Sequence, residues 1–499
     1  MVALLTHLTL SVRPCCSVCL VFLWFAPVVR AAETNQATNE FLLLDRFGRP
    51  VIVRTNEVPS GLLPPWRVGL QHQFPEPEKG TSMPEEALEK SRAAAKEFRW
   101  FPSVPPPLMP YLASQNEYGN TVARPGPLIC SYPLEPLVQG LKYRASDIGL
   151  RYSFQQTLNF VGLTDVMQGE DSLAFYTLQF KGKWAVYSSA GGDNSGWITT
   201  QIGAKTGLDH HSNTQDARSN LGTVTDPTGI WSSVNGIRIP ELAWQQSLCG
   251  GRVVAVAGMI SQRNYFDANA YAQSGRSEFM NSALIHSMVL TLPHYNFGLN
   301  IQYQPVKEWY AMVGSSAGNN SAGHAPWEDF NFDKWSLLGE LGYAPHDFLG
   351  LGTGVYRVQP FMGQADSPTE GGLCFNLQQQ LGRHSDFGWF GRFGFGGEEI
   401  SSSADEQIGT GFVMHAPLKH LGLVPRLSND LMGLGFIWSQ PGATDKQIYH
   451  ENEYVIETFY ALQFSPTVKL MPDFQYIANP AFSSHDHATA AQIQLVLNW

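Results

Sequence analysis

Apolar and polar positions alternate along the last twelve residues of the chain, Ala488 to Trp499. Ile493 and Leu495 fall on one face of this stretch, and Gln492 and Gln494 fall on the other. A period of two residues predicts a β-strand with one apolar and one polar face. An apolar strand at a sheet edge is prone to aggregation, whereas the last strand of a membrane barrel pairs with the first. A terminal strand of a soluble sandwich remains the alternative from this stretch alone.

The same alternation recurs about sixteen times from residue 147 onward, and an even number of strands is typical of single-chain bacterial barrels. We expect strands near residues 148–160, 171–181, 183–189, 235–248, 252–261, 287–303, 309–315, 334–344, 348–358, 371–381, 387–396, 406–416, 428–438, 453–464, 468–478 and 488–499. The predicted fold class is therefore all-β, a transmembrane antiparallel β-barrel of about 16 strands with a Pro-rich N-terminal extension.

Short and long connections alternate between these strands, as they do in outer-membrane barrels. Short turns are predicted at 180–184, 248–252, 304–309, 344–348, 381–387 and 464–468, with 417–427 as a longer exception. Long loops are predicted at 190–234, 262–286, 315–333, 359–370, 397–405, 439–452 and 479–487. A soluble sandwich has no reason to alternate its connections in this way.

The N-terminal third has a different organisation. Residues 1–32 resemble a signal peptide, with Arg13 followed by a short apolar core and small residues at the expected cleavage site. Residues 33–135 are predicted to be a Pro-rich periplasmic extension with one helix, Met83 to Arg99, and residues 136–499 to be the barrel. The extension is interpreted as a linker, with a plug or a partner-binding arm as the alternative.

Composition narrows the functional classes. Charged residues make up 15% of the chain, aromatics 12%, and the 47 glycines suit tight turns and barrel walls. The net charge of −11 argues against nucleic acid as a partner. Three widely spaced cysteines remain after residue 32, which predicts neither a disulfide framework nor a metal site. No cofactor is expected, and no nucleophile elbow or other catalytic setting predicts an enzyme.

Several stretches resemble the carbohydrate-selective porins of the OprB type. They are LVQGLKYRASDIGLRYSF at Leu137, IPELAWQQSL at Ile239, VVAVAGMISQRNYFDANAYAQSGRSEFMN at Val253, and ENEYVIETFYALQFSPTVKLMPDFQYIANP at Glu453. The likeness covers roughly residues 135–499. It implies a sixteen-stranded outer-membrane porin through which sugars diffuse.

One departure from the family pattern concerns the region after Gly258. The family usually has a basic and then an acidic residue there, whereas this chain has Met259 and Ser261. The family's constriction charges therefore do not carry over to these two positions.

Strand parity predicts which side chains face the inside of the barrel. The predicted pore-lining residues are Arg151, Gln155, Asn159, Glu241, Gln245, Asn376, Gln378, Arg392, Glu457, Asp473 and Gln475. Amides both donate and accept hydrogen bonds, which matches sugar hydroxyls without requiring a charge. Trp197, Tyr265 and Phe266, on predicted long loops, are candidates for stacking on sugar rings. The alternative is that these groups simply solvate a lumen.

We therefore expect an outer-membrane porin of a Gram-negative-type bacterium that admits sugars passively. The alternative function is a non-conducting binding or structural barrel plugged by its N-terminal extension. The expected partners are sugars as permeating solutes, outer-membrane lipid, and the outer-membrane insertion machinery, which would recognise the C-terminal strand. The sequence leaves open whether the barrel forms a homo-oligomer.

Overall fold

The fold is described from a computed structural model. It describes residues 40–44, 50–54, 145, 150–188, 194–209, 212, 216–229, 236–290, 296–306, 308–317, 334–345, 347–364, 370–382, 386–396, 404–424, 430–442, 446–465 and 467–498. The predicted signal peptide, the helix at Met83 to Arg99, Cys130 and Trp499 lie outside these residues.

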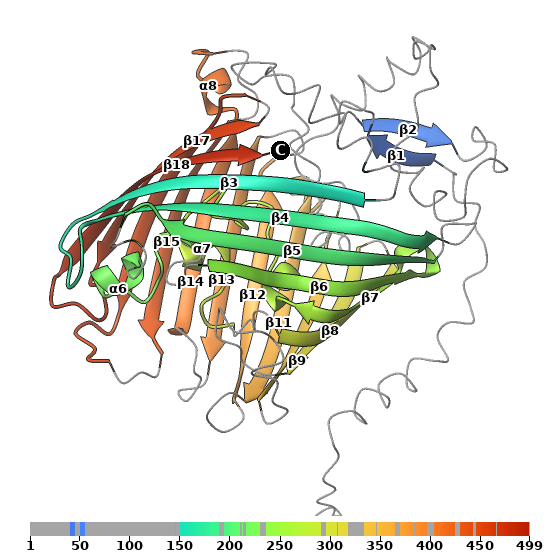
Figure 1. Cartoon of the computed structure of the whole chain (residues 1–499), viewed down its shortest axis with the longest axis horizontal. Coiled ribbons are helices and arrows are strands. Elements are labelled where there is room, and N and C mark those ends of the chain that lie inside the picture. Colours follow the sequence, from blue (N-terminus) through green and yellow to red (C-terminus); the bar gives the residue numbers. More distant parts are fainter. Residues whose placement is uncertain are drawn as a thin grey trace, which may run out of the picture.

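Sixteen strands among the described residues form one closed antiparallel barrel (Figure 1). They are β3 (Leu150–Leu163), β4 (Ser172–Ser188), β5 (Ser195–Gly207), β6 (Gly236–Leu248), β7 (Val253–Ile260), β8 (Asn296–Val306), β9 (Trp309–Ala317), β10 (Trp335–Tyr343), β11 (Gly354–Gln364), β12 (Glu370–Gln380), β13 (Phe387–Gly396), β14 (Ala404–His415), β15 (Leu431–Pro441), β16 (Glu453–Gln463), β17 (Val468–Ala478) and β18 (His487–Asn498). Each strand pairs with its sequence neighbour, and β18 closes the ring against β3. The predicted fold class is confirmed.

The predicted strand number was right because two errors compensated. Residues 171–181 and 183–189, expected as two strands with a turn at 180–184, form the single long strand β4. Gly182 and the lysines beside it resemble a turn, yet the alternation of β4 continues through them. Strand β5 was missed altogether, because its glycine and threonine residues resemble a loop.

Two further boundaries were wrong. The strand expected at 287–303 begins only at Asn296, because the backbone N–H of Ser287 donates to Asp267 in a loop that folds inward. The strand expected at 348–358 is β11, which begins at Gly354 and continues into the predicted loop at 359–370, ending at Gln364. Gly350 and Gly352 take positive φ angles of 79° and 101° and lengthen the preceding turn.

The described residues of the N-terminal extension form β1 (Glu40–Leu44) and β2 (Pro50–Arg54), a two-stranded antiparallel sheet separate from the barrel sheet. This hairpin was not predicted. The domain boundary at residues 135 and 136 stays a prediction.

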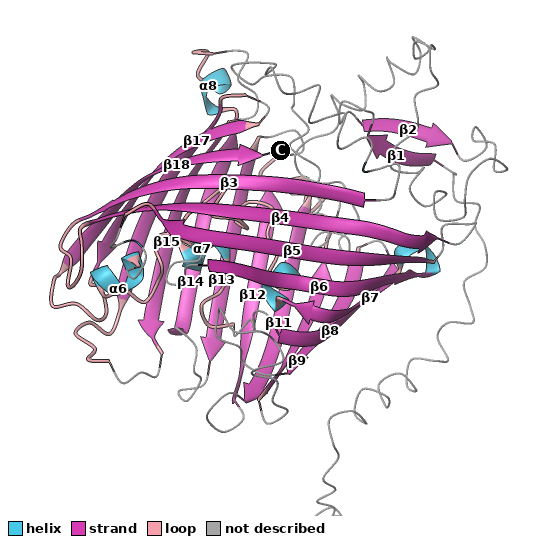
Figure 2. Ribbon diagram, in the orientation of Figure 1, coloured by secondary structure: helices cyan, strands magenta, loops and turns pink. Residues whose placement is uncertain are grey.

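No helix among the described residues is long and apolar enough to cross a membrane. Figure 2 shows how short the helical segments are beside the strands.

The two faces of the barrel wall differ in chemistry. On the outer face, large apolar side chains such as Leu434, Phe474 and Ile493 are exposed, and Ile493 is 54% exposed. The alternate positions carry buried polar side chains such as Gln475 and Gln492. This is the arrangement of a barrel whose outer face contacts lipid and whose inner face is polar.

Candidate functional site

One long loop, residues 261–290 between β7 and β8, folds against the inner face of the barrel. It contains the short helical turns η6 (Gln262–Asn264) and α7 (Ser282–Ile285). Glycines on the inner wall make room for it: a Cβ atom on Gly433 would lie 2.7 Å from Phe279 Cζ, and one on Gly394 would lie 2.8 Å from Val289 Cβ. A Cβ on Gly388 would overlap the ring of Tyr271. Glycine at these positions therefore allows the loop to lie directly on the wall.

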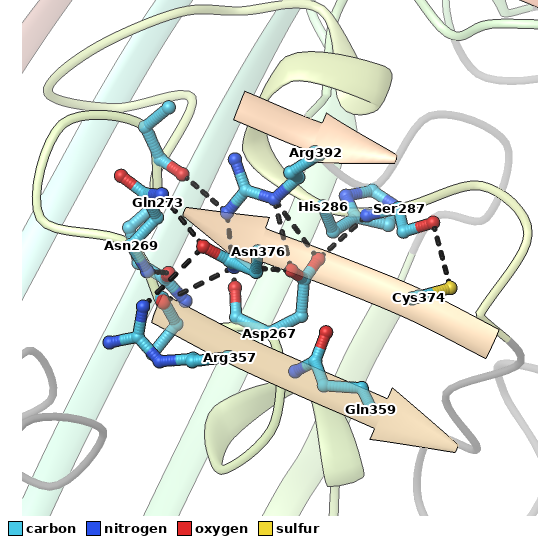
Figure 3. Close-up of polar contacts among 12 residues, drawn as sticks. Asp267, Asn269, Gln273, His286, Ser287, Arg357, Gln359, Cys374, Asn376 and Arg392 are labelled. Carbon is cyan, nitrogen blue, oxygen red and sulfur yellow. Dashed lines mark hydrogen bonds and ion pairs between the residues drawn. The ribbon is translucent and has the colours of Figure 1, made fainter. Parts of the chain in front are cut away.

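An ion pair between Arg392 of β13 and Asp267 fixes the middle of this loop (Figure 3). Arg392 Nε lies 3.0 Å from Asp267 Oδ1 and 3.2 Å from Oδ2, and Nη2 donates to the carbonyl oxygens of Asp267 and Ala272. Asp267 also accepts from Ser287 N at 2.6 Å and from Asn376 Nδ2 at 2.5 Å. The buried charges are thus compensated by each other and by hydrogen bonds.

Asn376 and Gln378 of β12 hold the neighbouring part of the loop. Asn269 Nδ2 donates to Asn376 Oδ1 at 2.8 Å, and the backbone N–H of Ala270 donates to Gln378 Oε1 at 2.9 Å. Arg357 of β11 donates more weakly to both amides, at 3.4 Å. Two predicted lining residues are therefore brought together, and both bind the loop.

A second polar cluster joins β9, β10 and β11 on the same wall. Tyr310 Oη donates to Glu340 Oε1 at 2.5 Å, and Arg357 Nε donates to Tyr310 Oη at 2.9 Å. Gln359 Nε2 donates to Glu340 Oε2 at 2.6 Å. Parity of the predicted strands did not identify Glu340 and Arg357 as candidates, although both lie on the inner face.

Glu457 of β16 anchors the end of loop 261–290. Its carboxylate is fully buried and accepts from the backbone N–H groups of Met280, at 2.5 Å, and Asn281, at 3.0 Å. Gln475 of β17 accepts from Asn281 Nδ2 at 3.0 Å and donates to Asp473 Oδ1 at 2.9 Å. The predicted residues Glu457, Asp473 and Gln475 therefore lie together, and this group holds the loop.

Glu278, in the same loop, closes a tight local turn. Its carboxylate accepts from the backbone N–H groups of Gln273, at 2.6 Å, and Ser274, at 2.9 Å. Burial raises the pKa of Glu278, although these hydrogen bonds and the nearby charge of Lys469 oppose the rise. This group was not predicted, because no short-range sequence pattern distinguishes it from an exposed loop carboxylate.

A second loop, residues 216–229 between β5 and β6, packs beside the first. It carries α6 (Ala217–Leu221), which Asp216 caps by accepting from Ser219 N at 2.8 Å. Glu453 of β16 accepts from the backbone N–H groups of Val224, at 2.8 Å, and Thr225, at 3.1 Å. This loop also accepts hydrogen bonds at Pro227 O from Gln475 and Gln492, at 2.8 and 2.7 Å.

The remaining predicted residues lie on the other wall. Glu241 of β6 accepts from Asn264 Nδ2 at 2.8 Å, and Gln245 of the same strand is buried. At the closing seam, Gln155 Nε2 donates to Asn498 Oδ1 at 2.8 Å, and Asn159 Nδ2 donates to Gln492 Oε1 at 3.2 Å. The side chain of Arg151 lies outside the described part of the chain. Whether the predicted residues line a conducting pore stays a prediction.

Basic residues on β4 to β6 are the main group that sequence reasoning missed. Lys181 and Lys183 occupy alternate inner positions of β4, and Lys205 occupies an inner position of β5. Lys183 Nζ lies 4.6 Å from the ring centroid of Trp197. Trp197 itself lies in strand β5 and not in the long loop that was predicted to carry it. The unbroken alternation of Phe175, Thr177, Gln179, Lys181 and Lys183 was the signal that could have revealed them.

The inner face of the barrel carries many buried hydrogen-bonding side chains. Its inner surface combines amides, hydroxyls and charges that match hydroxyl-bearing solutes. Among the described residues, no three His, Cys, Asp or Glu side chains gather in a way that could hold a metal ion. Tyr265 and Phe266, candidates for stacking on sugar rings, pack instead in an apolar cluster that includes wall residues such as Met312 and Leu338, and Phe266 is buried.

Comparisons with known proteins agree with this architecture. The chain is 25% identical to Porin AaxA of Chlamydia felis over 276 residues, 53% of this chain and 59% of that protein. It is 24% identical to Porin AaxA of Chlamydia caviae over 287 residues, 54% of this chain and 58% of that protein. The matched part thus spans about six tenths of these relatives.

A solved structure, the high-pH structure of Pseudomonas putida OprB, resembles the fold with a TM-score of 0.58. The match has 15% sequence identity and covers 72% of this chain and 96% of that one. The sequence pattern of the carbohydrate-selective porins of the OprB family matches residues 200–371 and 362–495, more than half of the chain. The chain therefore belongs to the OprB family of carbohydrate-selective porins.

Proposed function

We propose that this protein is an outer-membrane porin that admits sugars by passive diffusion. The observation that carries the proposal is loop 261–290, which is fixed inside the barrel by Arg392, Asn376 and Glu457. A sixteen-stranded barrel is otherwise wide enough to hold an aqueous channel. A loop anchored across it narrows the lumen to a size at which side chains can contact a solute.

The loop anchors occur mainly on β12 to β17, so we place the solute path along the opposite wall, β18 and β3 to β6. That wall carries the predicted residues Gln155, Asn159, Glu241 and Gln245 together with the lysines of β4. Amide and hydroxyl groups can exchange hydrogen bonds with sugar hydroxyls without binding them so tightly that passage stops.

The proposed partners follow from the two faces of the wall. Outer-membrane lipid would contact the exposed apolar side chains, and sugars would pass inside. The insertion machinery would recognise β18, whose Ile493 and Leu495 carry the apolar outer face of the closing strand.

The test is single-channel conductance of the purified full-length protein in planar bilayers, combined with swelling of liposomes in isosmotic glucose, maltose and sucrose. We expect steady conductance and sugar-dependent swelling. Absence of both, in protein that shows the heat-modifiable mobility of a folded barrel, would reject the porin proposal. It would favour the alternative of a barrel plugged by residues 33–135, and a chain lacking those residues would then conduct.

A further inference from the structure

Two turns at the same rim of the barrel carry the same tripeptide at their tips. Turn 344–353, between β10 and β11, contains Leu349-Gly350-Leu351, and turn 416–430, between β14 and β15, contains Leu421-Gly422-Leu423. The second turn also carries the short helix α8 (Pro417–His420), which lies beyond the ends of the strands at the top of Figure 1. The two central glycines take left-handed φ angles of 79° and 69°. Both tips therefore place a left-handed glycine between two leucines.

The leucines at these tips are far more exposed than apolar side chains in an aqueous turn usually are. Leu349 is 82% exposed, and Leu421 and Leu423 are 68% and 67% exposed. Leu349 also has a φ of 53°, in the left-handed region where glycine and asparagine are preferred. Large apolar side chains that are exposed together in this way mark a surface that meets another apolar phase.

The turn between β12 and β13, residues 381–386, joins the two tips into one surface. The backbone N–H of Gly382 donates to Leu351 O at 2.7 Å on one side. On the other side, Asp386 Oδ2 lies 2.8 Å from His420 Nε2 of α8. Four strand spacings separate the two tips along the ring, which is about 19 Å. We define the leucine rim as Leu349, Leu351, Leu421 and Leu423.

The leucine rim is continuous with the lipid-facing wall. It lies at the rim that carries the short turns, such as 464–467, and this rim faces the periplasm in outer-membrane barrels. Phe348, next to Leu349, packs on Tyr356 with ring centroids 5.0 Å apart, and Tyr356 stacks on Tyr343 at 6.4 Å. Tyr343 and Tyr356 share the outer face with Leu341 and Val358. Aromatic side chains at this level form the interfacial belt of a membrane barrel, so the first tip begins within that belt.

The apolar band of the strands is short on this side of the barrel. On β4 the outward apolar positions run from Tyr176 to Val186, which is ten residue steps. On β15 they run from Met432 to Trp438, and on β11 from Tyr356 to Met362, which is six steps each. At about 3.4 Å per residue and a tilt of about 40°, ten steps cover about 26 Å of membrane and six cover about 16 Å. A band of about 25 Å therefore needs about 10 Å more apolar surface at the ends of β11 and β15, where the two tips lie.

We propose that the leucine rim is embedded in the periplasmic leaflet of the outer membrane, among phospholipid headgroups and the upper part of the acyl chains. The four leucines complete the apolar band where the strands fall short of it. They hold the β10–β15 side of the barrel at a fixed depth in the leaflet. This inference goes beyond the proposed porin function and does not depend on conduction.

The first test measures the surroundings of each tip with a spin label. Labels are attached to Leu349→Cys and Leu421→Cys, one at a time, in the exported full-length protein carrying Cys130→Ser and Cys249→Ser; Cys374 is buried and stays. The protein is reconstituted into vesicles of phosphatidylethanolamine and phosphatidylglycerol. We expect both labels to collide more with oxygen, which concentrates in lipid, than with a water-soluble nickel chelate.

Two further label positions calibrate this measurement. Leu434→Cys, on the exposed outer face of β15, should favour oxygen, and Glu308→Cys, in the exposed turn between β8 and β9, should favour the nickel chelate. Nickel access at either tip equal to that at Glu308→Cys would overturn the leucine rim. Shielding of either tip from both reagents would also overturn it, because protein rather than lipid would then cover that tip.

The second test varies the thickness of the bilayer. The variant Leu349→Ser/Leu351→Ser/Leu421→Ser/Leu423→Ser should fold into vesicles of 12-carbon phosphatidylcholine as wild type does. In 18-carbon vesicles its folded fraction, measured by heat-modifiable mobility, should fall about tenfold relative to wild type, because a mismatch of about 10 Å is then uncompensated.

The matched control removes four exposed apolar side chains from the opposite rim, in Met167→Ser/Leu208→Ser/Ile448→Ser/Tyr449→Ser. These side chains lie beyond the band that the strands already complete, so this variant should show no added dependence on thickness. Equal behaviour of the two variants would contradict the proposal. The spin labels decide the question by themselves if the leucine variant fails to fold in either lipid.

Discussion

Asp267 and Arg392 form a buried ion pair across 125 positions of sequence, and both side chains are only 1% exposed. The pair joins a loop to a barrel strand, so it controls where the loop lies rather than whether the strands pair. Asp267 adopts a left-handed backbone conformation (φ 59°), which is unusual for a residue other than glycine. The surrounding hydrogen bonds hold it in that conformation.

We predict that Asp267→Asn releases loop 261–290 from the wall. The substitution leaves the Arg392 charge buried without its counter-ion, and breaking a buried pair in this way costs about 3–5 kcal/mol. Single-channel recordings should show larger and noisier conductance, and thermal unfolding should shift to lower temperature. The control Asp165→Asn, in a mostly exposed contact of 3.9 Å with His487, should behave as wild type. Unchanged conductance and unfolding in Asp267→Asn would contradict the anchoring role.

Glu457→Gln should act on the loop more than on ion selectivity. Glu457 accepts from two successive backbone N–H groups, whereas glutamine offers one acceptor and brings a donor that faces them. We expect faster loop fluctuations in current recordings and a loss of about 1–3 kcal/mol in the stability of the docked loop. A pure change in anion-to-cation permeability, with no change in noise or thermal unfolding, would show that this carboxylate lines an aqueous channel.

Gly433→Ala should displace the aromatic part of the loop. The added Cβ would lie 2.7 Å from Phe279 Cζ and would also meet the ring of Phe459, and overpacking typically costs about 1–3 kcal/mol. The strands should still pair, so heat-modifiable mobility is retained while conductance rises. Gly162→Ala is the matched control, because its Cβ meets only the Ala491 carbonyl oxygen at 3.9 Å. Equal behaviour of the two variants would argue against close packing of the loop.

Loop docking should strengthen on acidification through Glu278. Burial raises the pKa of this carboxyl, so the docked loop binds the proton more tightly than the released loop does. The stabilisation is complete below the ordinary carboxyl range and is lost as the pH rises through the raised pKa. Loop-opening steps in wild-type recordings should therefore become rarer as the pH falls from neutral, and Glu278→Gln should lack this dependence. The same pH dependence in both proteins would assign it to another group.

Deletion of Trp499 should impair assembly of the barrel. β18 pairs with both β17 and β3, so the ring cannot close until the last strand is in place. We expect secreted but misassembled protein, measured as a loss of heat-modifiable barrel in outer-membrane fractions. Leu349→Ser, which removes an exposed apolar side chain from a turn, should assemble normally. Normal barrel levels after the deletion would exclude this residue as an assembly signal.

Strand parity predicted most of the wall, because each strand is amphipathic by itself. It placed Glu241, Asn376, Arg392 and Glu457 on the inner face without any knowledge of their contacts. It failed where glycine and charge interrupt an otherwise regular alternation, as at Lys181, Gly182 and Lys183. The sequence neighbours of these residues resemble a turn, and only pairing with β3 and β5 distinguishes the two alternatives.

The contacts made by these inner residues could not be predicted in the same way. The carboxylate of Glu457 accepts a hydrogen bond from Asn281, which lies 176 residues away in the sequence. The carboxylate of Glu453 accepts one from Val224, which lies 229 residues away. Each carboxylate accepts hydrogen bonds from backbone N–H groups of a different loop, and the residue types of the two loops do not reveal such contacts. The packing of a loop inside a barrel depends on the shape of the whole inner wall. Here the loop fits partly because Gly388, Gly394 and Gly433 leave space where a Cβ atom would collide with its side chains.

The unequal distribution of loop anchors around the ring has an evolutionary consequence. Most anchors lie on β12 to β17, where one substitution disturbs several hydrogen bonds at once. The wall formed by β3 to β6 carries fewer of them, so its inner residues can be exchanged with less loss of stability. Lineages of such barrels would then diverge in solute preference mainly through β3 to β6, while the anchoring wall changes slowly.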